Sequence, residues 1–399
     1  MNNEKIQQAT EHFAQILQAE LARIDKMKNS EGFVDYSTLP TITIGIVGGD
    51  GIGPFIADQT QKILETLLAD ALKTDRIRLK VVEGLTIENR IAKMQAIPDE
   101  VLAELQECDV ILKGPTTTPR RGDDMPNIES ANVSMRRAFD LFANVRPVKI
   151  PQDNIDWVFF RENTEGEYIL GSQGVDVTED LAIDFKAITT QGVERIVRAA
   201  FEYAKQNGRK RVTVVTKANV IKTTDGKFLK IAQEIAKEYP GISCDDWYID
   251  IMAAKLIDPS RRSEFEVLVM PNLYGDILTD QAAQLQGGVG TAGSANIGTK
   301  HAMFEAIHGS APRMVDEGRA QYADPSSLVR AAVMMLEHIG FKTEAKNLDM
   351  ALDICGQYEK KFVLTSRANG VTNDQYTDYI LDTLADPNIE AKWLSYTQK

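Results

Sequence analysis

The 399-residue chain has few cysteines, and their scarcity excludes a disulfide framework. Cys108, Cys244 and Cys355 are odd in number and lack the spacing of a metal site. We therefore expect a reducing, cytoplasmic compartment. Near the start of the chain, Glu4 and Glu11 lie among polar residues, which is unlike a signal peptide or an acid-poor transit peptide.

Long hydrophobic runs and excess positive charge are also absent. No apolar run approaches the roughly 20 residues that span a bilayer, so we expect no membrane partner. The 45 Lys and Arg residues are outnumbered by 58 Asp and Glu residues. The net charge of -13 argues against nucleic acid as a partner, because phosphates would be repelled. With 43% hydrophobic residues, the chain reads as a globular protein of two domains.

Apolar residues at intervals of three and four predict a helix within about the first 35 residues. They are Phe13, Ile16, Leu17, Leu21, Ile24 and Met27. Two roles remain open for this helix, packing onto the body of the protein or assembly of several copies.

The following segment alternates strand and helix patterns. Strands are predicted over 41–47, 79–82 and 110–112, with helices over 55–69 and 99–107. This alternation favours an α/β fold with a parallel sheet. The glycines at 49–53 are spaced G-x-G-x-G, so they lack the third glycine of the Rossmann dinucleotide fingerprint.

Asp276 and Asp280 follow a buried-strand pattern and are four residues apart. On a helix this spacing places both carboxylates on one face. Hard oxygen ligands of this kind suit Mg²⁺ or Mn²⁺. Acidic residues at a helix start can also simply complement the helix dipole, so both interpretations remain open here.

Several motifs occur in a specific order along the chain. They are residues 130–136, 144–147, 160–168 and 216–219, Asp250, and residues 271–280 and 305–312. In this order they resemble the β-decarboxylating dehydrogenases, which include isocitrate, isopropylmalate and homoisocitrate dehydrogenases. The resemblance runs from about Thr41 to the C-terminus.

The resemblance implies an isocitrate/isopropylmalate dehydrogenase-like α/β fold, distinct from the Rossmann fold. Residues 1–36 would be an N-terminal helical extension. Residues 37–141 and 287–399 would form a large discontinuous cofactor-binding domain, and 142–286 a small domain. A strand-rich clasp over about 166–187 would hold a second copy of the chain.

The resemblance also assigns substrate-binding residues. Arg136, Arg146 and Arg161 would hold the substrate carboxylates, with Asn219 nearby. Ser130 and Asn132 would donate hydrogen bonds to the γ-carboxylate of isocitrate, where an isopropylmalate enzyme has Leu and Glu. Ser130 can also serve as the N-cap of a helix over 133–141, and both roles can hold together.

The implied chemistry needs a metal and two proton-carrying groups. The metal, Mg²⁺ or Mn²⁺, would lie between Asp276, Asp280 and an Asp250 from the other subunit. Lys217 would assist deprotonation of the substrate hydroxyl, and Tyr168 would return a proton to carbon after CO₂ leaves.

The resemblance places the coenzyme on two loops. Thr117 and Thr118 would contact the nicotinamide ribose, after which the loop through 120–124 is longer than usual. The adenosine would meet His308, Gly309, Ser310, Ala311, Arg313 and Asp324. Arg313 can pair with a 2′-phosphate, but Met314 cannot replace the expected tyrosine and Asp316 and Glu317 follow, so the sequence favours NAD and leaves NADP open.

The function implied is oxidation and decarboxylation of isocitrate to 2-oxoglutarate and CO₂, with NAD or NADP as coenzyme. Because Lys217 and Asp250 would complete the neighbour's site, we expect a homodimer with shared active sites, and larger assemblies stay open. The alternatives are a related enzyme for 3-isopropylmalate, homoisocitrate or tartrate, and a non-catalytic regulatory subunit.

Overall fold

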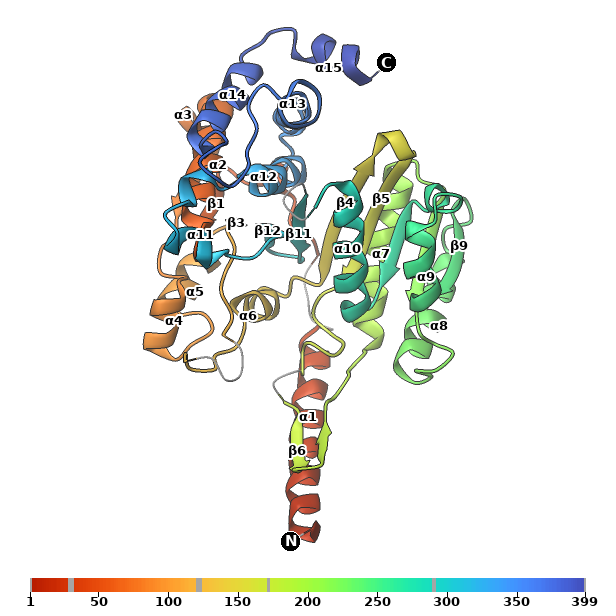
Figure 1. Cartoon of the computed structure of the whole chain (residues 1–399). Coiled ribbons are helices and arrows are strands. Elements are labelled where there is room, and N and C mark those ends of the chain that lie inside the picture. The colour runs from red at the N-terminus through yellow and green to blue at the C-terminus, as the bar shows by residue number, and fades with distance from the viewer. Residues whose placement is uncertain (1, 28–31, 120–123, 171–172, 289–291, 398–399) are drawn as a thin grey trace. The chain divides into compact units, whose positions relative to one another are not determined.

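A computed structural model describes residues 2–27, 32–119, 124–170, 173–288 and 292–397. Residues 120–123 of the long loop expected over 120–124, and residues 171–172 of the expected clasp, lie outside this range. The chain divides into two compact units (Figure 1). Unit 1 comprises Met1–Phe33, Asp140–Gln286 and Ile297–Thr299, and unit 2 comprises Val34–Phe139, Gly287–Asn296 and Lys300–Lys399.

Five strands of the main sheet lie in unit 1, in the order β4-β5-β10-β8-β9. The strands are β4 (Ala143–Ile150), β5 (Ile155–Glu162), β8 (Arg211–Thr216), β9 (Ser243–Tyr248) and β10 (Val267–Met270). The helices are α1 (Asn2–Met27), α7 (Thr190–Gln206), α8 (Thr224–Ala236), α9 (Ile249–Ile257) and α10 (Asn272–Gln286), with short 3₁₀ turns at Pro151–Asp153 and Arg262–Glu264.

The sheet of unit 1 is not purely parallel. Strands β5, β10, β8 and β9 pair in parallel, but β4 pairs with β5 antiparallel. The sheet is therefore mixed at this pair, which lies outside the segment for which a parallel sheet was predicted. The physical reason is the short turn at Pro151–Asp153, closed by Asn154 at a φ of 53°, because only antiparallel strands can be joined by so few residues.

Alternation of side chains along β5 gives this unit a core on each face of the sheet. Val158 and Phe160 lie in one buried cluster together with residues of α7 and α8. Trp157 and Phe159 lie in another, together with residues of α9 and α10. Burial of both faces fixes the strand register, and the parallel strands β5, β8 and β10 end at one edge.

The N-terminal helix α1 runs beside strand β6 (Val175–Thr178) in unit 1 (Figure 1). Strands β6 and β7 (Leu181–Ile183) form a two-stranded antiparallel arm. Only part of the predicted apolar stripe is covered, since Ile16 is buried but Leu17 and Leu21 are exposed.

Unit 2 contains strands in the order β2-β1-β3-β12-β11. These strands are β1 (Ile42–Val47), β2 (Ile77–Val81), β3 (Val110–Lys113), β11 (Gly293–Ile297) and β12 (Ala302–Ala306). The helices are α2 (Gly53–Leu67), α3 (Ala69–Lys73), α4 (Ile87–Lys93), α5 (Asp99–Gln106), α6 (Ala131–Ala138), α11 (Pro312–Asp316), α12 (Ser326–His338), α13 (Lys342–Asp353), α14 (Asn373–Leu384) and α15 (Ile389–Thr397). Short turns lie at Tyr36–Thr38 and Ala320–Tyr322, and a π-helical segment at Ile354–Glu359.

Parallel pairing of β1 with β2 and β3, and of β3 with β12, confirms the parallel arrangement predicted for the first half of the chain. The predicted helix over 133–141 ends earlier than expected, at Ala138. Asp140 takes a φ of 47°, and the chain then enters β4. Within the described residues, no helix has the length and apolar character needed to cross a membrane.

Candidate active site

Arg161 lies near the end of β5, where it approaches the start of α10 in unit 1. Its side chain is 1% exposed. The Nε and Nη2 atoms donate to Oδ1 of Asn272 at 3.0 and 2.7 Å, and Nη1 pairs with Oδ1 of Asp276. A planar guanidinium with this fork of bonds is held in one orientation.

Tyr168 completes this cluster. Its hydroxyl donates to Oδ2 of Asp276 at 2.8 Å, and the Arg161 guanidinium carbon lies 5.6 Å from the centre of its ring. Burial, and then the hydrogen bond to Asp276, raise the pKa of Tyr168 to about 12. The phenol is therefore protonated near neutral pH and can donate a proton.

Asp276 is ionised in this cluster. Burial opposes its ionisation, but the guanidinium of Arg161 and the hydroxyl of Tyr168 outweigh burial and lower the pKa of the carboxyl group. The structure thus brings three predicted residues together, Arg161, Tyr168 and Asp276. Asn272, which holds Arg161, was not predicted, although it stands in the same sequence motif.

Arg146 and Asp280 form a second pair along α10. Nη1 of Arg146, on β4, donates to Oδ1 of Asp280 at 3.0 Å and to Oγ1 of Thr279 at 2.7 Å. Two arginines from neighbouring strands therefore meet the two aspartates of one helix. The acidic side chains are balanced locally, although the protein as a whole is negative.

Lys217 and Asp250 form a third pair, with 2.5 Å between Nζ and Oδ1. Lys217 follows β8, and its backbone N donates at 2.7 Å to Oδ2 of buried Asp225, which also accepts from Tyr274. Asp225 fixes the backbone of Lys217 and was not predicted. Asn219 is exposed beyond Lys217.

The aspartates suit a hard divalent cation by their chemistry. Asp276 is ionised, Asp280 offers a side chain that is 59% exposed, and carboxylate oxygen is the donor that Mg²⁺ and Mn²⁺ prefer. Over the residues that the structure describes, one chain contains no group of three His, Cys, Asp or Glu side chains able to hold a metal ion. The predicted set takes Asp250 from a second chain, so it stays a prediction.

Arg136 lies in unit 2, where it pairs with Glu305 of β12. Nη2 of Arg136 is 3.1 Å from Oε1 of Glu305, and Nζ of buried Lys113 is 3.3 Å from Oε2. Asn296 Nδ2 donates to the same carboxylate at 2.8 Å. Burial opposes ionisation of Glu305, but Lys113 and Arg136 lower its pKa to about 2.

Ser130 occupies the N-cap of α6, but its side chain makes no capping hydrogen bond. Its predicted capping position is confirmed, and its predicted capping bond is not formed. The side chain of Asn132 is oriented by Thr116, whose Oγ1 donates to Oδ1 at 3.0 Å. Asn132 therefore faces the loop after β3.

The glycine-rich turn at 48–53 packs against two other loops of unit 2. Gly51 has a φ of 59°, and an added Cβ would lie 1.9 Å from the carbonyl oxygen of Ser310. The buried Asp50 carboxylate accepts from the backbone N of Thr117 at 2.7 Å. Close packing of loops therefore accounts for these glycines.

The predicted coenzyme residues partly meet in these loops. Thr117 Oγ1 and Ser310 Oγ are 2.7 Å apart, while Thr118 and Gly309 are exposed. Ala311 takes a φ of 43° at the start of α11. Of the predicted coenzyme residues, Thr117 and Ser310 are thus in direct contact.

The remaining coenzyme candidates lie before, within and after α11 along the chain. Nδ1 of His308 lies 3.0 Å from the carbonyl oxygen of Gly309, and Oδ1 of Asp324 accepts from the backbone N of Ser326 at 2.8 Å. Arg313 lies in α11 and pairs with Glu317 at the C-terminal end of that helix, with 2.5 Å between Nε and Oε1. The predicted phosphate partner is thus engaged by a carboxylate of its own chain.

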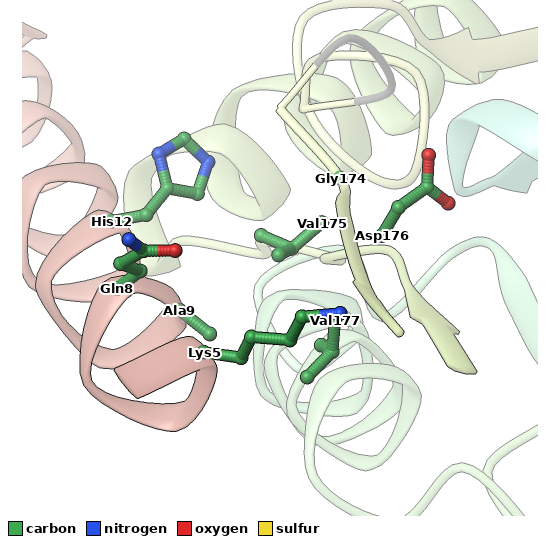
Figure 2. A pocket seen from close by; sticks show the side chains of 8 residues that line it. All are labelled: Lys5, Gln8, Ala9, His12, Gly174, Val175, Asp176 and Val177. Carbon is green, nitrogen blue, oxygen red and sulfur yellow. The ribbon is translucent and has the colours of Figure 1, made fainter. Parts of the chain in front are cut away.

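A hollow of about 400 Å³ lies between α1 and β6 (Figure 2). It is lined by Lys5, Gln8, Ala9, His12, Gly174, Val175, Asp176 and Val177. None of the candidate active-site residues is among them. The hollow therefore belongs to the contact of the N-terminal helix with the arm.

Comparison with known families matches this chain to one group of enzymes. A family model described as isocitrate/isopropylmalate dehydrogenase matches residues 43–365. The chain belongs to the isocitrate/isopropylmalate dehydrogenase family. The predicted resemblance and α/β fold are confirmed.

Individual relatives carry several related names. Isocitrate dehydrogenase (NAD) subunit 2, mitochondrial, of Schizosaccharomyces pombe is 36% identical over 355 residues, 86% of this chain and 87% of the relative. Isocitrate dehydrogenase (NADP) of Rickettsia prowazekii is 41% identical over 309 residues, 74% of this chain and 59% of the relative. Homoisocitrate dehydrogenase of Methanocaldococcus jannaschii is 36% identical over 326 residues, 78% of this chain and 89% of the relative.

Among solved structures, the isocitrate dehydrogenase of Methylococcus capsulatus is similar to this chain. The TM-score is 0.75 at 36% sequence identity, and the match covers 86% of this chain and 99% of the other. The fold similarity therefore extends over almost the whole of that enzyme.

The buried Glu305 carboxylate should make the free energy of unfolding depend on pH. Replacing Glu305 by Gln leaves Lys113 and Arg136 without their counter-charge, so we expect a loss of about 3–5 kcal/mol in free energy of unfolding near neutral pH. Because folding lowers the pKa of Glu305 from 4.5 to about 2, its contribution is present above pH 4.5 and disappears as the pH falls through about 2.

Urea unfolding followed by circular dichroism, at several pH values, measures this contribution. The difference between wild type and Glu305→Gln should shrink as the pH drops below 4.5. Glu317→Gln is the control, since that carboxylate pairs at the surface and should cost at most about 1 kcal/mol. Equal losses in the two variants would contradict the expectation.

Proposed function

We propose that this protein oxidises and decarboxylates isocitrate to 2-oxoglutarate and CO₂ while reducing a nicotinamide coenzyme. The observation that carries the proposal is the cluster of Arg161, Tyr168 and Asp276, which joins a guanidinium, a protonated phenol and an ionised carboxylate. Family membership supports the same reaction class.

Ser130 and Asn132 support isocitrate over related substrates. A hydroxyl that makes no capping bond and an oriented amide can both donate to a carboxylate. A pocket without donors would leave the γ-carboxylate of isocitrate unpaired, which costs several kcal/mol. The apolar isopropyl group of 3-isopropylmalate would in turn leave these polar groups unsatisfied.

The residues of the chain have separate tasks in the reaction. Arg146 and Arg161 hold substrate carboxylates and so orient the C2 hydrogen for transfer. Asp276, Asp280 and the partner's Asp250 would hold Mg²⁺ or Mn²⁺, which would supply Lewis-acid chemistry when bound. Lys217 assists removal of the hydroxyl proton, and Tyr168 returns a proton to carbon after CO₂ leaves.

For the coenzyme, we propose NAD in preference to NADP. Arg313 is the residue suited to a 2′-phosphate, but Glu317 pairs with it at 2.5 Å. A phosphate brought there would meet this carboxylate, so binding would cost either repulsion or a broken ion pair. Glu317 also accepts from Arg319, which favours its ionised state.

We also propose a homodimer in which Lys217 and Asp250 act in the partner's site, in a reducing, cytoplasmic setting. In one chain these two residues pair with each other and lie outside the cluster around Asp276. The three cysteines are free, which agrees with a reducing compartment. Larger assemblies stay open.

Two alternatives have support of their own. A relative named homoisocitrate dehydrogenase keeps a longer substrate open, alongside 3-isopropylmalate and tartrate. A non-catalytic subunit stays open because one relative is named as a subunit of a larger enzyme. Retention of Tyr168, Lys217 and Asp276 counts against the second alternative.

An assay of coenzyme reduction tests the proposed reaction. With isocitrate and Mg²⁺, we expect the absorbance of reduced coenzyme to rise, faster with NAD⁺ than with an equal concentration of NADP⁺. Homoisocitrate, 3-isopropylmalate and tartrate should each give at least about a tenfold lower kcat/KM. A chelator should abolish the rate. No reduction of either coenzyme with isocitrate would overturn the proposal.

Tyr168→Phe tests the proton donor. The variant removes only the hydroxyl, so we expect kcat to fall by about 10²- to 10⁴-fold while KM for isocitrate changes little. Tyr239→Phe is the matched control, because its hydroxyl bonds Glu202 on a distant part of unit 1 and its loss should leave kcat unchanged. Steady-state rates that are equal for the two variants would contradict the assigned role.

A further inference from the structure

The N-terminal helix α1 contacts the chain on both sides of Tyr168. Before Tyr168, Nη2 of Arg23 donates to Oε1 of Glu165 at 3.0 Å. After it, Ile16 is buried in one cluster with Ile169 and Leu170. A helix that holds both flanks of a segment restricts how that segment moves.

The same helix is anchored further along the arm. The rings of Phe13 and Phe185 stack with their centres 5.3 Å apart. Nε2 of His12 lies 2.8 Å from the carbonyl oxygen of Gln173, beside the hollow shown in Figure 2. These contacts hold α1 against the arm of unit 1. The position of Arg23 beside Glu165 is therefore fixed by the packing of the helix.

Glu165 is a buried carboxylate that needs compensation. Its side chain is 0% exposed and accepts from the backbone N of Thr189 at 2.8 Å and from the Thr189 hydroxyl. An added Cβ on Gly192 would lie 2.3 Å from this carboxylate, so it fits tightly against the start of α7. The helix dipole there favours the negative charge.

A second buried carboxylate lies beside it. Glu162 accepts from the backbone N of Thr164 at 3.0 Å and of Glu165 at 2.6 Å. Burial, and then the charge of Glu165, raise the pKa of Glu162. The positive charge of Arg195 compensates the Glu162 carboxylate, and that of Arg23 compensates the Glu165 carboxylate.

A short series of bonds leads from Glu165 to the reacting groups. The backbone oxygen of Glu165 accepts from Nδ2 of Asn272 at 3.0 Å. Oδ1 of Asn272 in turn accepts both bonds from Arg161, which pairs with Asp276. A displacement of Glu165 therefore shifts the residue that orients Arg161.

We infer that Arg23 is a positioning residue for the proposed reaction, because its charge holds Glu165 and thereby the segment that carries Arg161 and Tyr168. The inference rests on the proposed function for its kinetic consequences only. The inference assigns the N-terminal helix α1 a structural role in the active site of its own chain. Arg23 touches no reacting group, and its effect passes through Glu165 and Asn272.

Arg23→Met tests this role, because it keeps the aliphatic stem and removes the charge. We expect kcat to fall by about 10- to 100-fold and KM for isocitrate to rise. KM for the coenzyme, whose candidate residues lie in unit 2, should stay unchanged. Arg23→Lys should regain most of the activity. A loss of folded protein alone would lower kcat and leave both KM values unchanged.

Two further variants serve as controls. Arg198→Met removes a surface pair with Glu238 in the same unit and should leave all constants unchanged. In a Glu165→Gln background, Arg23→Met should change kcat/KM by less than about threefold, because the charge that it compensates is gone. This background also allows a measurement where Arg23→Met alone does not fold.

Hydrogen exchange tests the inference without any activity. Amide exchange at Glu165 and Thr189 should accelerate at least about tenfold in Arg23→Met and stay near wild type in Arg23→Lys and Arg198→Met. An inactive wild type with this exchange pattern would contradict the proposed function alone. Unchanged exchange together with unchanged kinetic constants in Arg23→Met would overturn the inference.

Discussion

The ion pair between Arg161 and Asp276 is the interaction on which the rest of the candidate site depends. It joins the end of β5 to the first turn of α10, and it keeps Asp276 ionised although the carboxylate is partly buried. Tyr168 is oriented by the same carboxylate. Arginine side chains also compensate the buried carboxylates of Glu305 and Glu165.

Periodicity predicted the regular elements well wherever one face of an element is buried. The strand patterns at 41–47 and 110–112 correspond to β1 and β3, and the helix pattern at 99–107 corresponds to α5. Pairing direction was harder to predict, because the antiparallel join of β4 and β5 depends on a short turn and on Asn154. The end of α6 depended likewise on the backbone conformation of one residue, Asp140.

The candidate residues could be named from motif order, but not the groups that hold them. Asn272 and Glu305 act through bonds to Arg161 and Arg136, which are 111 and 169 positions away, and single-sequence patterns carry no signal for such pairs. Spacing did give Asp276 and Asp280 one helix face, because helical geometry is local. The contact between Arg23 and Glu165 joins residues 142 positions apart, so only the folded chain brings it into view.

The central claim is that one active site uses Asp276 from one chain and Asp250 from another, and subunit mixing tests it most directly. Asp250→Asn and Asp276→Asn should each be nearly inactive, yet an exchanged mixture of equal amounts should regain about a quarter of wild-type activity, because each mixed dimer has one intact site. A mixture of Asp276→Asn with Asp280→Asn should regain none. No recovery in the first mixture, with exchange verified by native mass spectrometry, would contradict the account.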